Sequence, residues 1–296
     1  MMNMNKTTVI ANIALYTFLL LFALSILFPF YNMMILSVAS FEHAAQTGFY
    51  LVPRSFTMAN YQRIFNDRAI INAILISLRN VITGTAMAMV MTVFASYVLS
   101  KKNLPGRRML FYFVIFTMYF SGGLIPWFMV LRSMGFVNNV WVMTVPSMMS
   151  AFNMILMRNY FMSLPDSLEE SAKLDGAGEF TIMWRIIVPL SAPIMATVAL
   201  FYAVAFWNQW WNAMLFIQDT NLTPLALLLR RLVIENSVDF GADPAGIAMI
   251  AGGAGQVHNR ALEMATVAVA TVPILCVYPF LQKYFTAGIM LGAIKA

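Results

Sequence analysis

The sequence predicts an all-α, polytopic membrane protein with six transmembrane helices in one domain that covers residues 1–296. Composition is the first reason: 61% of the residues are hydrophobic and 10% are charged, whereas a soluble domain carries roughly 25% charged residues. The second reason is length, because the apolar segments reach the ~20 helical residues that cross a bilayer and exceed barrel strands of ~10 residues. Lipid offers no hydrogen bonds to the backbone, so helices are the expected spanning element.

Six apolar segments are long enough to span the membrane. They are residues 10–38, 71–99, 109–131, 139–162, 186–216 and 263–284. Several exceed about 25 residues, so we expect them to tilt or to extend beyond the bilayer. The first follows Lys6 and is much longer than the ~7–15-residue apolar core of a signal peptide, so it is expected to remain as a helix. Prolines near the spans, such as Pro126 and Pro193, predict kinks.

The loops between the spans set the topology. Residues 100–108 read SKKNLPGRR, with four cations and no acid, which indicates a cytoplasmic loop. Six spans then place both termini in the cytoplasm, together with the loop 163–185. The outer side receives residues 39–70, 132–138 and 217–262, and the glycines of the last segment favour a flexible loop over a folded domain.

Charge and cysteine usage exclude several classes of function. The net charge of +6 comes from 18 Lys and Arg against 12 acids. Membrane orientation explains this excess better than nucleic-acid binding, since no basic run and no soluble module occur. The single Cys276 lies in an apolar stretch and is interpreted as a buried, inert thiol. The two histidines, His43 and His258, fall in loops and give no metal-ligand cluster.

The loop between the fourth and fifth spans carries a helix signal. Asp166 and Glu169 have the spacing of a capping box, and Ser167 and Glu170 offer the same spacing. A helix is therefore predicted to begin just after Pro165.

Small residues follow on that predicted helix. Ala172 and Gly176 are four residues apart and share a face, which predicts a shallow surface, nearly free of side chains, where another protein could dock. Gly176 and Gly178 then allow a turn before the chain continues through Trp184 to Pro189. The charges alone are equally consistent with an ordinary solvated loop helix that binds no partner.

The whole segment EESAKLDGAGEFTIMWRIIVP, residues 169–189, resembles the cytoplasmic coupling loop of ABC importer permeases, whose pattern is E-A-A-x3-G-x9-I-x-L-P. The matching positions are Glu170, Ser171, Ala172, Gly176, Ile186, Val188 and Pro189. Ser171 and Val188 depart mildly from the pattern, and the placement of the segment between two spans supports the coupling interpretation.

The resemblance extends over essentially the whole chain. ASYVLSKKNLPGRRMLF (95–111), FSGGLIP (120–126), FNMILMRNYFMSLP (152–165), LFYAVAFWNQWWNA (200–213) and the closing QKYFTAGIMLGAIKA are similar to a carbohydrate branch of these permeases. That branch includes the smaller permease subunit of the maltose importer. SGGLIP and KYFTAGIM are most similar to its lipo-oligosaccharide and polysaccharide type, which includes alginate-oligosaccharide importers.

The resemblance implies a type I ABC importer fold with a cytoplasmic coupling helix, in the bacterial cytoplasmic (inner) membrane. It implies a second homologous permease subunit, two nucleotide-binding ATPase subunits and an extracytoplasmic solute-binding protein that delivers an oligosaccharide. ATP and Mg would be bound by the ATPase subunits, so no cofactor and no metal is expected in this chain. No G-x4-G-K-[ST] phosphate loop occurs in the sequence, which agrees with a permease that is not an enzyme. The residues implied in ATPase coupling are Glu169, Glu170, Ser171, Ala172, Lys173, Asp175, Gly176 and Ala177.

Residues of the substrate path are sought in the fifth span, which carries FWNQWWNAM. Trp207 and Trp211 are four apart, and so are Asn208 and Asn212. One helix would present an aromatic strip beside an amide strip, which suits the apolar faces and hydroxyls of sugars. The alternative is an aromatic belt at the outer interface together with packing.

A second path candidate is Arg79 with Asn80, within the second apolar segment. An arginine in a span is costly and marks a cavity or a partner, here a path cation for an acidic cargo. Snorkelling to the outer interface is the alternative.

The glycine-rich stretch near 241–256 matches the outer loop that probes the binding protein in the maltose-type family. The residues expected to make that contact are Gly252, Gly253, Gly255 and Gln256. A solvated linker would have the same composition.

Other functions stay open beside a saccharide importer. An importer permease for another small polar solute would share the coupling loop. A stand-alone secondary transporter usually shows more spans, paired broken helices and intramembrane acids, whereas the acids here lie almost entirely in loops. An intramembrane enzyme lacks support, because no HExxH, Ser–His pair or Asp pair occurs within the spans. The saccharide itself stays open, since the binding protein and a shared cavity would select it.

Overall fold

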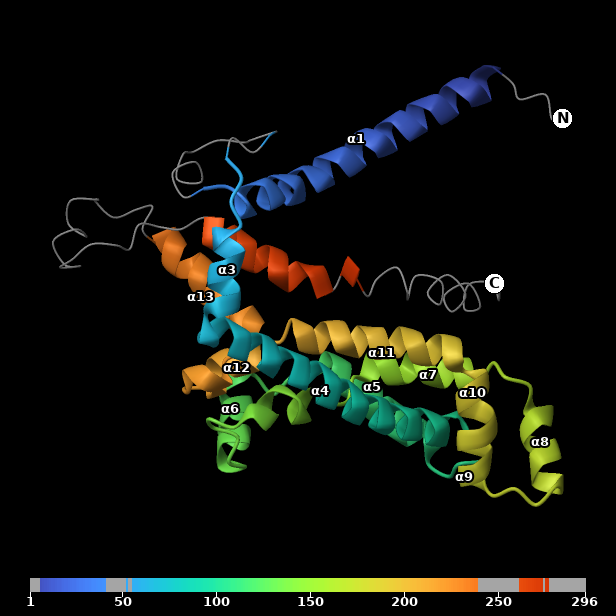
Figure 1. Ribbon diagram of the computed structural model, residues 1–296. Coiled ribbons are helices and arrows are strands. Elements are labelled where there is room, and N and C mark those ends of the chain that lie inside the picture. Colours follow the sequence, from blue (N-terminus) through green and yellow to red (C-terminus); the bar gives the residue numbers. More distant parts are fainter. Residues whose placement is uncertain (1–5, 41–51, 53–54, 239–260, 274, 277–296) are drawn as a thin grey trace. The chain divides into compact units, whose positions relative to one another are not determined.

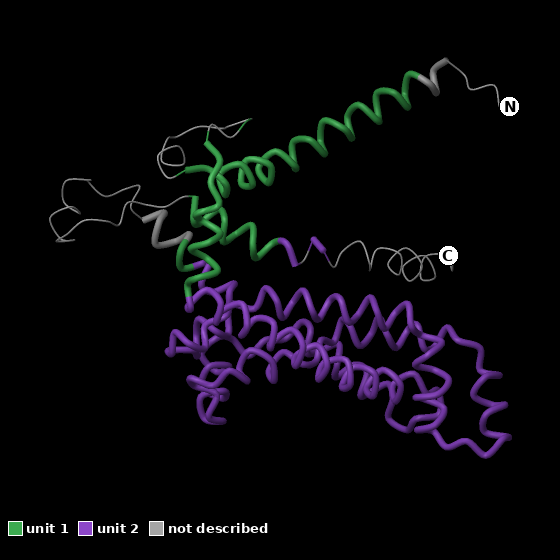
Figure 2. The backbone as a smooth tube through the Cα atoms, viewed as in Figure 1, with its two compact units in different colours: residues 1–67, 231–271 green, residues 68–230, 272–296 purple. Residues whose placement is uncertain are grey.

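The computed structural model describes residues 6–40, 52, 55–238, 261–273 and 275–276. Every regular element in these ranges is a helix (Figure 1), which confirms the all-α prediction. The chain divides into two compact units, shown in different colours in Figure 2. The first comprises Met1–Asp67 with Arg231–Thr271, and the second comprises Arg68–Arg230 with Val272–Ala296.

The first unit is built on α1 (Lys6–Ser37), a 32-residue apolar helix. Its side chains from Leu15 onward are mostly exposed, as expected of a helix whose solvent is lipid. The short helix α3 (Ala59–Asn66) packs against the C-terminal end of α1. Asn60 of α3 donates through Nδ2 to the carbonyls of Ser37 and Ala39 at 3.1 and 3.0 Å, which satisfies acceptors at the end of α1.

The second unit is organised around three helices, α4 (Arg68–Ser100), α7 (Ala151–Phe161) and α11 (Ala192–Trp207). Close approach between α4 and α11 depends on Gly84. A Cβ at this position would lie 2.9 Å from ring atoms of Phe206, so only glycine fits without movement of the ring.

Polar contacts join the same three helices inside their apolar core. The hydroxyls of Thr92 on α4 and Tyr202 on α11 lie 2.7 Å apart, and Ser96 on α4 donates to the carbonyl of Met154 on α7 at 2.9 Å. Thr92, Ser96 and Tyr202 are buried. Their hydroxyls therefore have the partners that a dry interior requires.

The segment 109–131 was expected to cross as one span, but it consists of two helices at 112° to each other. These are α5 (Arg107–Tyr119) and α6 (Leu124–Ser133). The chain turns at Gly123, which has a φ of +88°, a conformation that glycine adopts readily and that other residues rarely adopt. The hydropathy of the segment did not reveal this break, because hydropathy reports how apolar the residues are and not the direction in which the chain runs.

The segment 139–162 also bends, by 43° between Val140–Ser147 and α7. Two short 3₁₀ turns, η1 (Val140–Met143) and η2 (Val145–Ser147), precede α7, and Pro146 lies in the second. This agrees with the kink that prolines predict.

Within the described residues, three helices are long and apolar enough to cross a membrane, or up to five if each bent pair forms one span. The long ones are Ile10–Ser37, Arg68–Ser100 and Ala192–Phe216, the last of which is a single candidate span that contains both α11 and α12. A shorter apolar helix, Ala261–Pro273, opens the sixth predicted segment, whose continuation to 284 lies largely outside the described residues. The six-span count stays a prediction. Cys276 is exposed, so the prediction of a buried thiol was wrong. No other part of the described chain covers Cys276.

The remaining elements are short and lie in or next to the loops. They are α8 (Asp166–Leu174), α9 (Glu179–Ile182), the π-helical turn η3 (Met183–Ile187), α10 (Val188–Leu190), α12 (Trp211–Phe216), η4 (Thr220–Leu222) and α13 (Leu225–Val238). Figure 1 shows α8, α9 and α10 gathered at one end of the second unit's helices. This end carries the segment that the sequence singled out.

Candidate functional site

Helix α8 begins where the sequence predicts, directly after Pro165. The predicted capping box does not form. Pro165 itself is the N-cap and no side chain caps the helix, because Asp166 and Glu169 are both engaged by lysines of another loop. The acidic first turn still favours the helix through its dipole.

The C-terminal end of α8 is a Schellman motif, which fixes the exit of the chain. Gly176 has a φ of +80°, the left-handed conformation that glycine adopts without cost. The Ala177 N–H donates to the Ala172 carbonyl at 2.9 Å, and the Gly176 N–H donates to the Lys173 carbonyl at 3.0 Å. The predicted turn therefore forms, and the left-handed conformation is confined to Gly176, since Gly178 has an ordinary extended φ of −75°.

Ala172 faces the protein's own interior. It is buried in a cluster with Tyr97, Ile182 and Met183, and Ala177 packs against the same cluster. The small-residue face predicted for another protein is thus covered on the Ala172 side by this chain. The small side chain allows α8 to lie close to the helical core.

The outward side of α8 is formed by other residues. Glu170, Ser171 and Lys173 are exposed, and Leu174 is 90% exposed at the last position of the helix. An exposed leucine beside charged side chains is typical of a contact surface. Sequence reasoning passed over Leu174, although its place four residues after Glu170 marks it as part of the same face. Asp175 takes part in the turn through its backbone, which donates to the Ser171 carbonyl.

Two ion pairs tie α8 to the cationic loop that follows α4. The Lys101 Nζ lies 2.5 Å from Glu169 Oε2, and the side chains are only 21% and 26% exposed. The Lys102 Nζ lies 2.5 Å from Asp166 Oδ2, in a pair that is largely exposed. Since partly buried charges are screened less by water, the Lys101 pair is the stronger of the two.

Glu179 joins α9 to both neighbours. Its carboxylate accepts from the Lys173 Nζ at 2.7 Å, from the Tyr97 hydroxyl at 2.7 Å and from the Lys101 Nζ at 3.0 Å. The hydrogen bond from Lys173, followed by that from Tyr97, lowers the pKa of Glu179 to about 2. The same contact raises the pKa of Lys173. Both groups are therefore charged at neutral pH.

We call Tyr97, Lys101, Glu169, Lys173 and Glu179 the loop clamp. The Lys101 ammonium also lies 4.0 Å from the centroid of the Tyr97 ring, so one cation holds α4, α8 and α9 together. Sequence reasoning assigned Lys101 to topology alone and gave Glu179 no role. The signal was a cationic loop and an acidic loop on the same predicted side of the membrane.

The segment after α9 continues through the π-helical turn η3. Met183 and Ile187 of this turn are buried in the core cluster. A π-turn inserts one extra residue into a helix and is frequent at functional sites. The turn η3 follows α9 directly and leads through α10 into α11. It therefore links the loop clamp to α11.

The predicted aromatic and amide strips of the fifth span do not form. The helix breaks between α11, which ends at Trp207, and α12, which begins at Trp211. Trp207 is buried whereas Trp211 is exposed, and Asn208 is exposed whereas Asn212 is buried. Asn208 is the C-cap of α11: its backbone N–H forms the last helical hydrogen bond, to the Val204 carbonyl, and its side-chain amide donates to the same carbonyl at 2.9 Å. Asn212 Nδ2 donates to the Val142 carbonyl at 3.3 Å.

Arg79 and Asn80 also have partners within the second unit. The Arg79 guanidinium lies 4.7 Å from the ring centroid of Trp141. Asn80 is buried and donates to the Met143 Sδ at 3.2 Å. The two residues therefore pack against η1.

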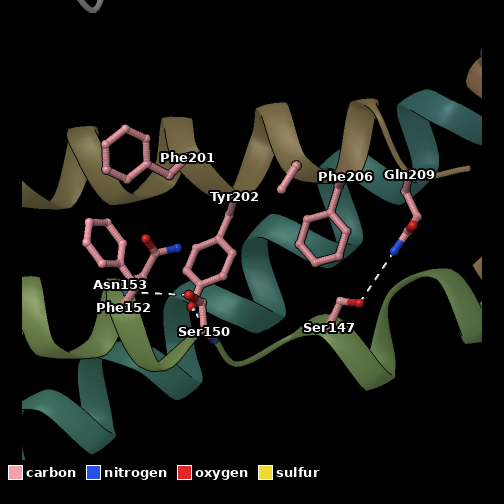
Figure 3. A pocket seen from close by; sticks show the side chains of 9 residues that line it. Ser147, Ser150, Phe152, Asn153, Phe201, Tyr202, Phe206 and Gln209 are labelled. Atoms are coloured by element: carbon pink, nitrogen blue, oxygen red, sulfur yellow. Dashed lines mark hydrogen bonds between the residues drawn. The ribbon is translucent and has the colours of Figure 1, made fainter. Parts of the chain in front are cut away.

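An open pocket of about 390 Å³ lies between α7 and α11, and sequence reasoning missed it. Figure 3 shows Phe152, Phe201, Tyr202 and Phe206 around it, with Gln209 bonded to a serine at one end. It is lined by Ser147, Ser150, Phe152, Asn153, Phe201, Tyr202, Ala205, Phe206 and Gln209. Aromatic faces beside hydroxyls and amides form the mixed surface that binds sugars.

Gly252, Gly253, Gly255 and Gln256, predicted to contact a binding protein, lie outside the described residues. That prediction stays open.

Three helices of the described residues are long and apolar enough to cross a membrane, which agrees with a membrane permease. The family described as "Binding-protein-dependent transport system inner membrane component" matches residues 5–237, and the chain belongs to it. The membrane location and the resemblance to ABC importer permeases are thereby confirmed.

Relatives extend over nearly the whole chain. It is 39% identical to the polygalacturonan/rhamnogalacturonan transport system permease protein YtcP of Bacillus subtilis, over 95% of this chain and 96% of that protein. It is 38% identical to the protein LplC of the same organism, over 90% and 88% of the two chains. A crystal structure of a bacterial ABC transporter involved in the import of the acidic polysaccharide alginate matches with a TM-score of 0.85 and 29% identity, over 95% of this chain and 99% of that chain. The predicted type I ABC importer fold is confirmed.

Proposed function

We propose that this chain is the permease subunit of an ATP-driven importer for oligosaccharides or polysaccharides and forms half of the translocation path. The observation that carries the proposal is the full-length likeness to a solved alginate importer chain at a TM-score of 0.85. YtcP is named as a permease protein of a polygalacturonan/rhamnogalacturonan transport system, and alginate is an acidic polysaccharide. An acidic saccharide is thus the favoured class of cargo.

The proposed assembly contains a second permease, two ATPase subunits and an extracytoplasmic solute-binding protein. In it, ATP hydrolysis occurs in the ATPase subunits, and this chain has no ATPase site. The loop 163–185 and both termini face the cytoplasm. The outward face of α8, with Glu170 and Leu174, would bind the ATPase subunit, and the exposure of Leu174 supports that role.

The loop clamp gives this contact its mechanical value. A movement imposed on α8 reaches α4 through Lys101 and reaches α9 through Glu179, because each ion pair joins two elements. Rigid transmission needs such fixed contacts between packed elements. The Schellman turn at Gly176 holds the exit of α8 in one conformation.

The pocket between α7 and α11 is our candidate for the sugar-contacting surface of this subunit. Phe152 and Phe201, whose ring centroids are 6.4 Å apart, offer faces for pyranose rings. Asn153 and Gln209 supply amides for hydroxyls. This surface replaces the Trp207 to Asn212 strips, which the helix break separates.

The test is uptake by proteoliposomes that contain the complete importer. We expect ATP-dependent uptake of galacturonate or alginate oligosaccharides, which stops when the binding protein or the ATPase subunits are omitted. Phe201→Ala should lower uptake, whereas Phe18→Ala, which changes an exposed aromatic side chain on α1, should not. Transport by this chain alone, without nucleotide, would contradict the proposal.

A further inference from the structure

A second pocket, of about 490 Å³, lies where the cationic loop after α4 meets α5 and α7. It is lined by Lys102, Leu104, Gly106, Arg107, Arg108, Phe111 and Arg158. Four of these seven residues are cations and none is an acid. The proposed transport function uses none of the three arginines.

Arg158 forms the floor of the pocket and is only 7% exposed. Its Nε donates to the Leu99 carbonyl at 2.9 Å, its Nη1 donates to Asn159 Oδ1 at 3.2 Å, and its guanidinium lies 4.3 Å from the ring centroid of Phe111. These contacts orient the group but do not neutralise it. No carboxylate pairs with Arg158 in the described part of the chain, although a buried charge normally requires a counterion.

The neighbouring cations add to this unbalanced charge. Arg107 lies close enough to Arg158 for the two charges to repel each other, and its only side-chain hydrogen bond to the described residues is donated by Nη2 to the Met162 sulfur at 3.4 Å. Arg108 forms no ion pair with the described residues. Lys102 alone is balanced, by Asp166. Three guanidinium groups therefore surround one space without an anion.

The backbone contributes in the same direction. Helix α5 has 13 residues and begins at Arg107, so the positive end of its dipole points at the pocket. Along the side of α5 that continues from the pocket, Tyr112 lies four residues after Arg108 and is 66% exposed, and Met118 lies seven residues after Phe111 and is 45% exposed. A cationic pocket that continues into an exposed apolar helix face matches one kind of molecule, with an anionic head and apolar chains.

We propose that this pocket binds the phosphodiester headgroup of an anionic phospholipid, whose acyl chains lie along α5. Arginine suits phosphate because its planar fork donates two parallel hydrogen bonds to two oxygens. Basic pockets between transmembrane helices bind anionic headgroups in this way. The positive-inside rule explains the sign of the loop, but it does not explain why Arg158 is buried and why three guanidinium groups converge.

The test measures lipid binding to the complete, detergent-purified importer by native mass spectrometry. Phosphatidylglycerol, phosphatidylcholine and inorganic phosphate are titrated separately and in competition. We expect phosphatidylglycerol to bind at least tenfold more tightly than phosphatidylcholine, and inorganic phosphate to be a poor competitor because it lacks acyl chains.

The variants assign that preference to the pocket. Arg108→Gln should weaken phosphatidylglycerol binding about fivefold, the effect of one cation near a membrane surface, and Arg107→Gln with Arg108→Gln about 25-fold. Arg132→Gln is the matched control, because Arg132 is an exposed arginine on α6 outside the pocket. Thermal unfolding and uptake, measured on each variant, identify any that lose affinity through misfolding.

Three results would overturn the proposal. The first is equal binding of phosphatidylglycerol and phosphatidylcholine. The second is unchanged lipid binding in the folded double variant. The third is inorganic phosphate that binds as tightly as the lipid and displaces it, since the occupant would then be a free anion. The lipid measurement does not depend on the saccharide, so its failure leaves the proposed function untouched.

Discussion

Lys101→Gln removes the central cation of the loop clamp while keeping a long polar side chain. The substitution abolishes the ion pairs with Glu169 at 2.5 Å and Glu179 at 3.0 Å. It also removes the ammonium that lies 4.0 Å from the Tyr97 ring centroid. We expect α8 to open from the helical core more often.

The size of the effect follows from burial. Lys101 and Glu169 are 21% and 26% exposed, and leaving a partly buried carboxylate without its charged partner costs about 2 kcal/mol. That corresponds to about a 30-fold rise in the open population of α8. Lys102 and Asp166 are 61% and 68% exposed, so their pair is worth about 0.5 kcal/mol, or about twofold.

Hydrogen exchange of the amides in Asp166–Leu174 measures this opening directly. We expect exchange about 30-fold faster in Lys101→Gln and about twofold faster in the matched control, Lys102→Gln. Equal acceleration in the two variants, or none in Lys101→Gln, would show that burial does not make the Lys101 pair hold α8.

Three further predictions concern single positions in the second unit. Gly84→Ala should destabilise the protein by about 1–3 kcal/mol, because its Cβ would meet the Phe206 ring at 2.9 Å; thermal unfolding should show no such loss for Gly122→Ala, which has open space around it. Gly176→Ala should cost about 1–2 kcal/mol through its φ of +80°, measured as faster hydrogen exchange in α8, and unchanged exchange would count against the turn. The lowered pKa of Glu179 means that its stabilising contribution is present above the ordinary carboxyl pKa of about 4.5 and is lost as pH falls toward about 2; a loss of protection in α8 between pH 5 and 8, after correction for the intrinsic pH dependence of amide exchange, would contradict this.

The helical class and the position of α8 could be predicted from sequence because both depend on local information. Composition establishes the lipid solvent, and the polar first turn after Pro165 establishes the helix start. The partners of that first turn could not be predicted. Asp166 and Glu169 pair with lysines more than 60 positions earlier in the chain, and such contacts depend on how distant helices pack.

Breaks inside apolar segments were the second feature that could not be predicted from the sequence. The segment 109–131 and the fifth span both satisfy hydropathy along their whole length, yet the first turns by 112° at Gly123. The second ends its helix at Asn208, whose side-chain amide bonds to the Val204 carbonyl. Helical spacing therefore predicted faces for Trp211 and Asn212 that no continuous helix presents.

The central claim is that α8 transmits force between this chain and separate ATPase subunits. Thiol cross-linking in the complete importer tests it most directly, with Leu174→Cys in a Cys276→Ser background. We expect a cross-link from residue 174 to an ATPase subunit that changes in yield when ATP is added, and no labelling by a membrane-impermeant thiol reagent applied outside intact cells. Labelling from outside, or no cross-link to either ATPase subunit, would show that α8 does not transmit force to the ATPase.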